Sequence, residues 1–153
     1  MTAVEKIVTR HWGKPGQNTL DGYKANGGYA SLKKALELAP EAVQAEVKKS
    51  NLRGRGGAGF PTGMKWSFVP KDRTETYLVI NADESEPGTF KDRVLMEEDP
   101  FALIEAMTIA GTTVGAELGF LYLRGEYPLA RARLTAALAE ARARGLLGDD
   151  VMG

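Results

Sequence analysis

Apolar residues recur every three or four positions in several parts of the chain, which predicts amphipathic helices. Other apolar runs are short and contain β-branched or aromatic residues, which is typical of buried strands. In chain order the pattern predicts helices over 31–39 and 40–50, a strand over 76–80, a helix over 100–118, a strand over 120–123 and a helix over 128–144. Residues 1–30 show no sustained period and are expected to be an irregular lead-in.

Start and stop signals support the helices of the second half. Asp99 and Pro100 read as an N-cap followed by a first-turn proline, while Gly119 and Gly145 read as helix ends. Two strands joined by a helical crossover imply a parallel pair with a right-handed connection, the unit of α/β sheets. Two strands alone do not make a stable sheet. We therefore expect residues 51–153 to be the N-terminal part of a larger α/β domain, preceded by a short helical region over 1–50.

Composition narrows the classes of function. Hydrophobic residues make up 43% and charged residues 26%, as in an average soluble domain. The 20 basic and 20 acidic residues cancel, so any recognition of phosphate must be local. With no cysteine, the sequence holds no thiol nucleophile or cysteine-ligated metal, and no metal site is expected. The single histidine, His11, is expected to be structural. No apolar run is long enough to cross a membrane.

The glycine-rich stretch Leu52–Trp66, called here the glycine loop, is the first candidate site. Glycines let a backbone approach a ligand closely. Basic side chains at both ends and the nearby rings of Phe60, Trp66 and Phe68 favour a ligand with phosphate and flat rings, such as a nucleotide.

Two familiar phosphate-binding motifs do not fit the glycine loop. Gly54, Gly56 and Gly59 match G-x-G-x-x-G, but a helix is predicted before them, and Phe60-Pro61 is expected to prevent a helix after them. The P-loop pattern fails because Gly63-Met64-Lys65-Trp66 lacks the adjacent Gly-Lys-Ser/Thr. A flexible surface loop is one alternative. An RNA-binding RGG segment is another, disfavoured by a single copy in a neutral chain.

The second candidate is the stretch Asn81–Arg93, called here the acidic segment, which begins where the first predicted strand ends. Ligands of open α/β sheets bind at the carboxyl ends of strands. The carboxylates of Asp83, Glu84 and Glu86 could accept hydrogen bonds from ribose or ring N–H groups, ligate a hard cation, or form a solvated turn. Recognition of a nucleotide explains both this segment and the glycine loop.

Both segments closely resemble the NADH-binding flavoprotein subunit of respiratory complex I, the NADH:quinone oxidoreductase of bacteria and mitochondria. The resemblance extends to Gly27-Gly28-Tyr29, Leu32–Leu36 and Arg124-Gly125-Glu126-Tyr127, and so covers nearly the whole chain. It implies a Rossmann-like flavin/NADH-binding domain. It also implies noncovalent FMN that accepts hydride from NADH and passes single electrons through iron–sulfur clusters to quinone.

The resemblance also assigns site residues, all of them cofactor-binding and none catalytic, because the cofactors carry out hydride transfer. It places Gly54, Gly56, Lys65, Asn81, Asp83, Glu84 and Ser85 on the FMN side. It places Gly57, Phe60, Phe68, Lys65 and Glu86 on the NADH side. The remaining members of the predicted site, given no side, are Arg55, Ala58, Gly59 and Gly63.

The sequence departs from the family in what it lacks. A Gly-Glu-Glu segment, an Asn-Asn segment and the four cysteines of a [4Fe–4S] cluster are not present, so we expect about the first third of such a subunit. Its expected partners are other peripheral-arm subunits, especially the thioredoxin-like [2Fe–2S] subunit, with neither nucleic acid nor direct membrane insertion. The expected location is cytoplasmic, on the inner face of the cell membrane.

Two other functions remain open at this stage. One is the diaphorase subunit of an NAD-reducing hydrogenase or NAD-dependent formate dehydrogenase, which the motifs do not distinguish. The other, from a different class, is a non-catalytic nucleotide-binding or scaffold fragment.

Overall fold

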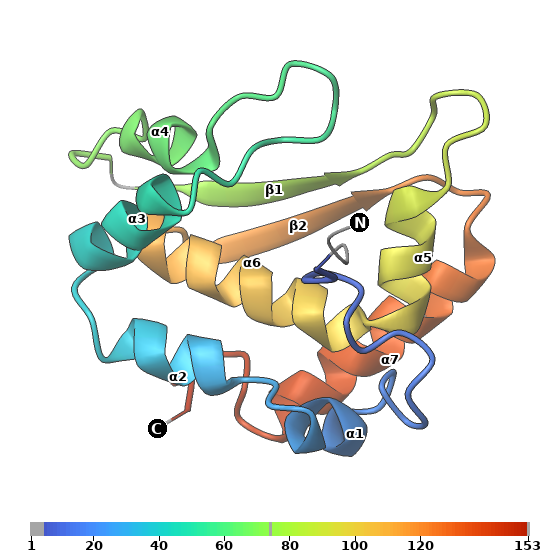
Figure 1. The fold of residues 1–153 in the computed structure, drawn as a ribbon. Helices are drawn as coiled ribbons and strands as arrows, with labels where there is room; N and C mark the ends of the chain where they lie inside the picture. The colour runs from blue at the N-terminus through green and yellow to red at the C-terminus, as the bar shows by residue number, and fades with distance from the viewer. Residues whose placement is uncertain (1–4, 74, 153) are drawn as a thin grey trace. The chain divides into compact units, whose positions relative to one another are not determined.

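The computed structural model describes residues 5–73 and 75–152. Residues 1–4, 74 and 153, which fall in the two predicted regions, lie outside the described part. In chain order the elements are α1 (Leu20–Ala25), α2 (Ala30–Leu36), α3 (Pro40–Lys49), α4 (Thr62–Ser67), β1 (Tyr77–Ala82), α5 (Lys91–Glu98), α6 (Pro100–Val114), β2 (Leu118–Leu123) and α7 (Pro128–Ala143) (Figure 1). This is the mixed α/β class that the sequence predicts.

The chain forms two compact units, which are described separately. The first contains residues 1–30, 81–105 and 121–153, and the second contains residues 31–80 and 106–120. The acidic segment belongs to the first unit and the glycine loop to the second. The two tryptophans are divided in the same way, with Trp12 in the first unit and Trp66 in the second.

The first unit has an apolar core between α5, α7 and the end of β1. Met96 of α5 packs with Ala82 of β1 and with Ala130 and Leu134 of α7, all of them buried. The helical spacing of Ala130, Leu134, Ala137 and Ala141 places one face of α7 in the interior, as the sequence predicts. Gly145 ends this region with a φ of 66°, a conformation that suits glycine at a helix C-terminus.

The N-terminal region is more ordered than predicted. Thr19 caps α1 through a hydrogen bond from the Gly22 N–H to its hydroxyl (3.2 Å). Tyr23 donates to the buried carboxylate of Glu105, which also accepts from the N–H of Tyr29 (2.8 Å). The expectation of an irregular lead-in is wrong for α1, which is too short for its period to be seen and is stabilised by these contacts with Glu105 of α6. Residues 5–19 contain turns and neither helix nor strand.

The second unit packs α4 directly against α3. Gly63 of α4 is buried, and a Cβ built on it would lie 2.6 Å from the backbone nitrogen of Lys48. Only glycine allows this approach. The expectation that Phe60-Pro61 prevents a helix is also wrong, since Pro61 is the N-cap of α4, a position outside the helical ladder that proline tolerates.

Strands β1 and β2 are neighbours in a 2-stranded sheet, and their arrows run in the same direction in Figure 1. The sequence predicts two buried strands, but β1 alternates between exposed and partly buried residues, and the first three residues of β2 are all exposed. In the second unit Tyr77, Val79 and Phe120 are each more than half exposed. Only one face of each strand therefore packs on the interior, and the apolar residues on the other face are exposed.

Several further boundaries differ from the sequence prediction. Helix α2 ends at Leu36 rather than at 39, and β1 extends to Ala82 rather than to 80. Helix α6 begins at Pro100 as expected, with Asp99 accepting a hydrogen bond from the Ala102 N–H, but it ends at Val114. Gly115, with a φ of 72°, rather than Gly119, ends it, and β2 begins two residues before 120. The sequence pattern also missed α5, whose apolar face is short.

Candidate functional site

The glycine loop is closed at its base by backbone hydrogen bonds in the second unit. The N–H of Thr62 donates to the Leu52 carbonyl (2.8 Å), and the N–H of Gly54 donates to the Phe60 carbonyl (3.0 Å). Arg53 adds a bond from its guanidinium to the Gly59 carbonyl (3.3 Å). The loop between α3 and α4, drawn in green in Figure 1, is thus fixed at its two ends by hydrogen bonds and is not a free linker.

The tip of this loop exposes bare backbone. A Cβ built on Gly56, Gly57 or Gly59 would meet nothing within 4 Å. Gly57 and Gly59 have φ values of 113° and 61°, which other residues rarely adopt. The positive φ values and the space above the glycines together leave room for a ligand to approach the main chain. Arg55 and Ala58 at the tip are also exposed.

Two aromatic rings and a lysine stand at the exit of the loop. Phe60 is 44% and Phe68 66% exposed, with ring centroids 6.1 Å apart and a tilt of 50°. Large apolar side chains at such exposure offer faces for a flat ligand. Lys65, in α4 between them in sequence, is exposed. Of the predicted loop residues only Gly63 faces the interior, where it packs on α3.

The acidic segment, in the first unit, is ordered by its own polar groups. Asn81 accepts a hydrogen bond from the N–H of Asp83 (2.9 Å), and the Ser85 hydroxyl donates to the Asp83 carboxylate (2.8 Å). Asn81, Asp83, Ser85 and Glu86 are all exposed. The carbonyl of Glu86 accepts from the N–H of Thr89 (3.1 Å), which closes the turn over Pro87 and Gly88.

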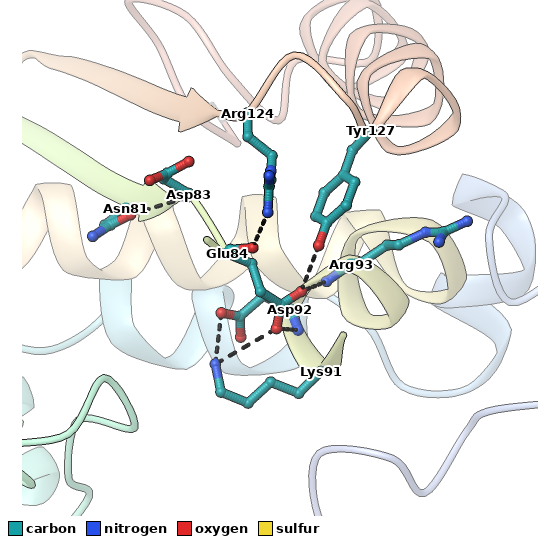
Figure 2. Close-up of polar contacts among 8 residues, drawn as sticks. All are labelled: Asn81, Asp83, Glu84, Lys91, Asp92, Arg93, Arg124 and Tyr127. Atoms are coloured by element: carbon teal, nitrogen blue, oxygen red, sulfur yellow. Dashed lines mark hydrogen bonds and ion pairs between the residues drawn. The ribbon is translucent and has the colours of Figure 1, made fainter. Parts of the chain in front are cut away.

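Glu84 differs from its neighbours because its side chain is buried, with 1% exposure. Its carboxylate accepts hydrogen bonds from the N–H groups of Asp92 and Arg93, each at 2.9 Å, in the first turn of α5. The hydroxyl of Tyr127 donates to the same carboxylate (3.3 Å), and the Lys91 ammonium lies 3.9 Å away. Figure 2 shows Glu84 at the centre of these contacts.

The environment of Glu84 keeps it ionised. Burial alone raises the pKa of a carboxyl, but here the N–H groups of Asp92 and Arg93, the charge of Lys91 and the Tyr127 hydroxyl outweigh burial, so the pKa of Glu84 is lowered. A carboxylate at a helix N-terminus is also favoured by the helix dipole. Glu84 is therefore a fixed negative charge that anchors α5.

Sequence reasoning missed Arg124 and Tyr127 as parts of this site. Arg124 donates to the Glu84 carbonyl, and Tyr127 donates to the Glu84 carboxylate. The only signal for them in the sequence is the Arg124-Gly125-Glu126-Tyr127 stretch, to which the family resemblance assigns no role. The structure thus gathers the predicted residues into two groups, the glycine loop with Phe60, Lys65 and Phe68, and the acidic segment with Arg124 and Tyr127. Their roles toward FMN and NADH remain predictions.

Neither group offers a paired acid and base for proton transfer. Within residues 5–73 and 75–152 no cluster of His, Asp and Glu is arranged to hold a metal ion. Across the same residues, no helix has the length and apolar character needed to cross a bilayer. The available chemistry is binding, by main-chain groups, rings and single charges.

Comparison with known proteins places both segments in one family. The Nuo51 FMN-binding domain of complex I matches residues 47–151, which include the glycine loop and the acidic segment. An NADH-quinone oxidoreductase subunit of Rhizobium meliloti (strain 1021) is 52% identical over 97% of this chain and 36% of its own length. NADP-reducing hydrogenase subunit HndC of Solidesulfovibrio fructosivorans is 46% identical over 97% of this chain and 30% of its own length.

A solved structure agrees. A chain of the NAD+-reducing [NiFe]-hydrogenase in the H2-reduced state superposes with a TM-score of 0.70 at 34% identity, covering 91% of this chain and 23% of that chain. The chain spans about a third of the length of the curated relatives it matches. With the family model covering most of the sequence, the chain belongs to the Nuo51 FMN-binding domain family of complex I flavoprotein subunits and has a partial Rossmann-like flavin-binding fold.

Proposed function

We propose that this chain is the N-terminal part of an NADH dehydrogenase flavoprotein subunit that binds FMN and NADH. The whole subunit would transfer hydride from NADH to noncovalent FMN and pass single electrons to iron–sulfur clusters and then to quinone. The match of residues 47–151 to the FMN-binding family carries the proposal, because it contains both candidate segments. The [4Fe–4S] cluster would be held by residues outside this sequence, which has no cysteine.

The glycine loop fits a mononucleotide physically. Added Cβ atoms on Gly56, Gly57 and Gly59 would point into open space, so these positions can give main-chain contacts to a phosphate or a ring. Phe60 and Phe68 offer partly exposed ring faces, and Lys65 a compact positive charge. Flavin supplies the hydride and single-electron chemistry when bound, and these residues need only bind and orient it.

The acidic segment fits the polar part of such a ligand. Asp83 and Ser85 present exposed oxygens that can accept or donate hydrogen bonds to hydroxyls or ring N–H groups. Glu86 is exposed beside the Pro87-Gly88 turn and is proposed to accept hydrogen bonds from a ribose of NADH. The Glu84 carboxylate is already bonded to α5, so a contribution to flavin binding by this residue would come through its main chain.

The proposal is tested on the full-length subunit that carries this chain, purified with its native partners. We expect stoichiometric FMN, released on denaturation, and reduction of the bound flavin by NADH seen as bleaching of its visible absorbance. Stoichiometric FAD, or a colourless protein that FMN does not reconstitute, would refute it. The second result would favour the non-catalytic scaffold alternative.

A diaphorase of a hydrogenase is the second candidate. The 46% identity to an NADP-reducing hydrogenase subunit and the structural match to an NAD+-reducing hydrogenase both favour it. The partners that copurify with the subunit separate the two. We propose peripheral-arm subunits of complex I, including the thioredoxin-like [2Fe–2S] subunit, at the inner face of the cell membrane, whereas a [NiFe] subunit among the partners would establish the diaphorase.

A further inference from the structure

Glu84 is held at two points, through its side chain and through its main chain. Its carboxylate is bonded to the first turn of α5, while its main-chain carbonyl accepts a hydrogen bond from Arg124 (Figure 2). A backbone fixed at both its side chain and its carbonyl has little freedom to rotate. The exposed residues on either side, Asp83 and Ser85, are therefore presented from a rigid point.

Arg124 is itself oriented by a second pair of bonds. Its Nε lies 3.1 Å from Glu126 Oε2 and its Nη2 lies 3.2 Å from Glu126 Oε1, a two-point contact between guanidinium and carboxylate. Such pairs fix the plane of a guanidinium. Nη1 reaches the Glu84 carbonyl, so all three guanidinium nitrogens of Arg124 already have a protein acceptor.

Tyr127 completes the arrangement. Its ring lies 5.4 Å from the Arg124 guanidinium carbon and 5.6 Å from that of Arg93, within the range of cation–π attraction. Its hydroxyl donates to Glu84 Oε2 (3.3 Å). The ring thus links the segment after β2 to both the carboxylate of Glu84 and the first turn of α5.

We propose that Arg124 and Tyr127 are positioning residues, which hold the main chain of Asp83–Ser85 in the geometry that binds the flavin nucleotide without touching the ligand. The inference rests on the proposed function. A substitution that removes such a support keeps the ligand-contacting groups in the sequence but lets them adopt more conformations. By analogy with outer-shell partners in metal sites, we expect an affinity loss of about tenfold.

The chain offers a matched control for loss of stability alone. Arg133 of α7 donates to the main-chain carbonyl of Glu97, near the opposite end of α5, and pairs with Glu98 at 3.5 Å. It is about as exposed as Arg124, with side-chain exposures of 30% and 26%. Arg124→Gln and Arg133→Gln therefore remove the same kind of contact, an arginine-to-carbonyl hydrogen bond with a neighbouring ion pair, at the acidic segment and at the C-terminal end of α5 respectively.

The test measures FMN dissociation constants by flavin fluorescence in the full-length subunit, together with unfolding by urea. We expect Arg124→Gln to weaken FMN binding about tenfold and Arg133→Gln to leave it within twofold, with similar shifts in urea midpoint. Glu126→Gln, at an exposed residue, should loosen Arg124 alone and weaken binding severalfold at unchanged stability, and it decides the matter if Arg124→Gln does not fold.

Equal losses of affinity in the Arg124 and Arg133 variants, or unchanged affinity in Arg124→Gln, would overturn the inference and leave the proposed function intact. An unchanged affinity in Glu126→Gln would overturn it as well when Arg124→Gln does not fold. Failure of the parent protein itself to bind FMN would overturn both.

Discussion

The glycine loop and the acidic segment present their polar groups in opposite ways. The glycine loop is pinned only at its base, by main-chain bonds such as Gly54 to Phe60, and its tip has open space above it. The acidic segment is pinned at its middle, where the buried Glu84 ties it to α5. One region offers main chain from a loop with few constraints, and the other offers side chains from a rigid point.

This difference separates two costs of building a site. A glycine loop loses much conformational entropy when it is ordered, so part of the binding energy of a ligand is spent on it. The acidic segment is already ordered by Glu84, so its loss of conformational entropy occurs during folding and not on ligand binding. We therefore expect substitutions at the open tip of the glycine loop to affect ligand binding and substitutions at Glu84 to affect stability first.

The largest effect is expected from Glu84→Ala. The substitution removes the buried Glu84 carboxylate and leaves the partly buried N–H groups of Asp92 and Arg93 without their acceptor, and it should lower the free energy of unfolding by about 3 kcal/mol. Asp83→Ala, at the exposed neighbour, is the control and should change it by about 0.5 kcal/mol or less. Urea denaturation measures both, and similar costs would show that Glu84 is no anchor.

The contribution of Glu84 should also depend on pH. Because its pKa is lowered in the folded state, the stabilisation is present above the ordinary carboxyl range and is lost as pH falls through the lowered pKa. The difference in stability between parent and Glu84→Gln should accordingly shrink in acid. A difference that stays constant down to the acid limit of folding would contradict the anchoring charge.

Next in size is a pair of substitutions in the glycine loop. Gly63→Ala places a Cβ 2.6 Å from the Lys48 backbone nitrogen and should destabilise the protein by about 2 kcal/mol. Gly56→Ala meets open space, so stability should hold while FMN affinity falls. Calorimetry and flavin titration on both variants separate the two effects. A destabilised Gly56→Ala protein would contradict the distinction between the open position of Gly56 and the packed position of Gly63.

The third prediction concerns Glu86 and rests on the proposed function. A carboxylate near the ribose should repel the 2′-phosphate of NADPH. Glu86→Gln should therefore lower the preference for NADH over NADPH about tenfold, equivalent to about 1.4 kcal/mol. The measurement is kcat/KM for NADH and NADPH at matched ionic strength, with flavin content as the control. An unchanged ratio of kcat/KM for the two nucleotides would limit Glu86 to a structural role in its turn, where its carbonyl accepts a hydrogen bond from Thr89.

The smallest expected effect is on stability and concerns Tyr29, which lies outside both the glycine loop and the acidic segment. The Tyr29 hydroxyl is buried with no hydrogen-bond partner among the described residues, so Tyr29→Phe should stabilise by under about 1 kcal/mol at neutral pH. Burial and the charges of Glu105 and Glu140 raise the pKa of Tyr29 to about 12.

In the parent, Tyr29 stays neutral when folded, and its contribution is complete below the ordinary pKa of 10.0 and lost as pH rises toward 12. The phenylalanine variant should therefore lose less stability across that range. Thermal unfolding at pH 7 and above 10 measures this, and identical alkaline slopes would contradict it.

Local signals in the sequence predicted most of the fold. Pro40, the Asp99-Pro100 pair and Gly145 mark helix ends correctly, because their chemistry acts within one turn. Short elements were missed because the contacts that stabilise them lie outside the helix itself: α1 bonds to Glu105, 82 residues from Tyr23, and the first turn of α5 bonds to Glu84, 8 residues before Asp92. The alternation in β1 was missed because Leu78 and Val79 are equally apolar although only one faces the interior.

The candidate site shows the same limit. The glycines and acidic residues stand out in the sequence, but burial does not, so Glu84 and Gly63 could not be told from their exposed neighbours. Arg124 and Tyr127 lie some 40 residues from Glu84, with separations of 40 and 43. Contacts of this kind depend on tertiary packing, which no local pattern encodes.

The division of the two tryptophans between the units gives each unit its own optical probe. Within this sequence, Trp66 of α4 is the indole that remains in a Trp12→Phe variant, and Trp12 of the N-terminal region is the indole that remains in Trp66→Phe. Coincident emission changes during denaturation would establish one cooperative transition, and separate ones would establish two. Flavin absorbs where indole emits, so quenching of Trp66 would report a bound isoalloxazine by energy transfer, with no turnover required.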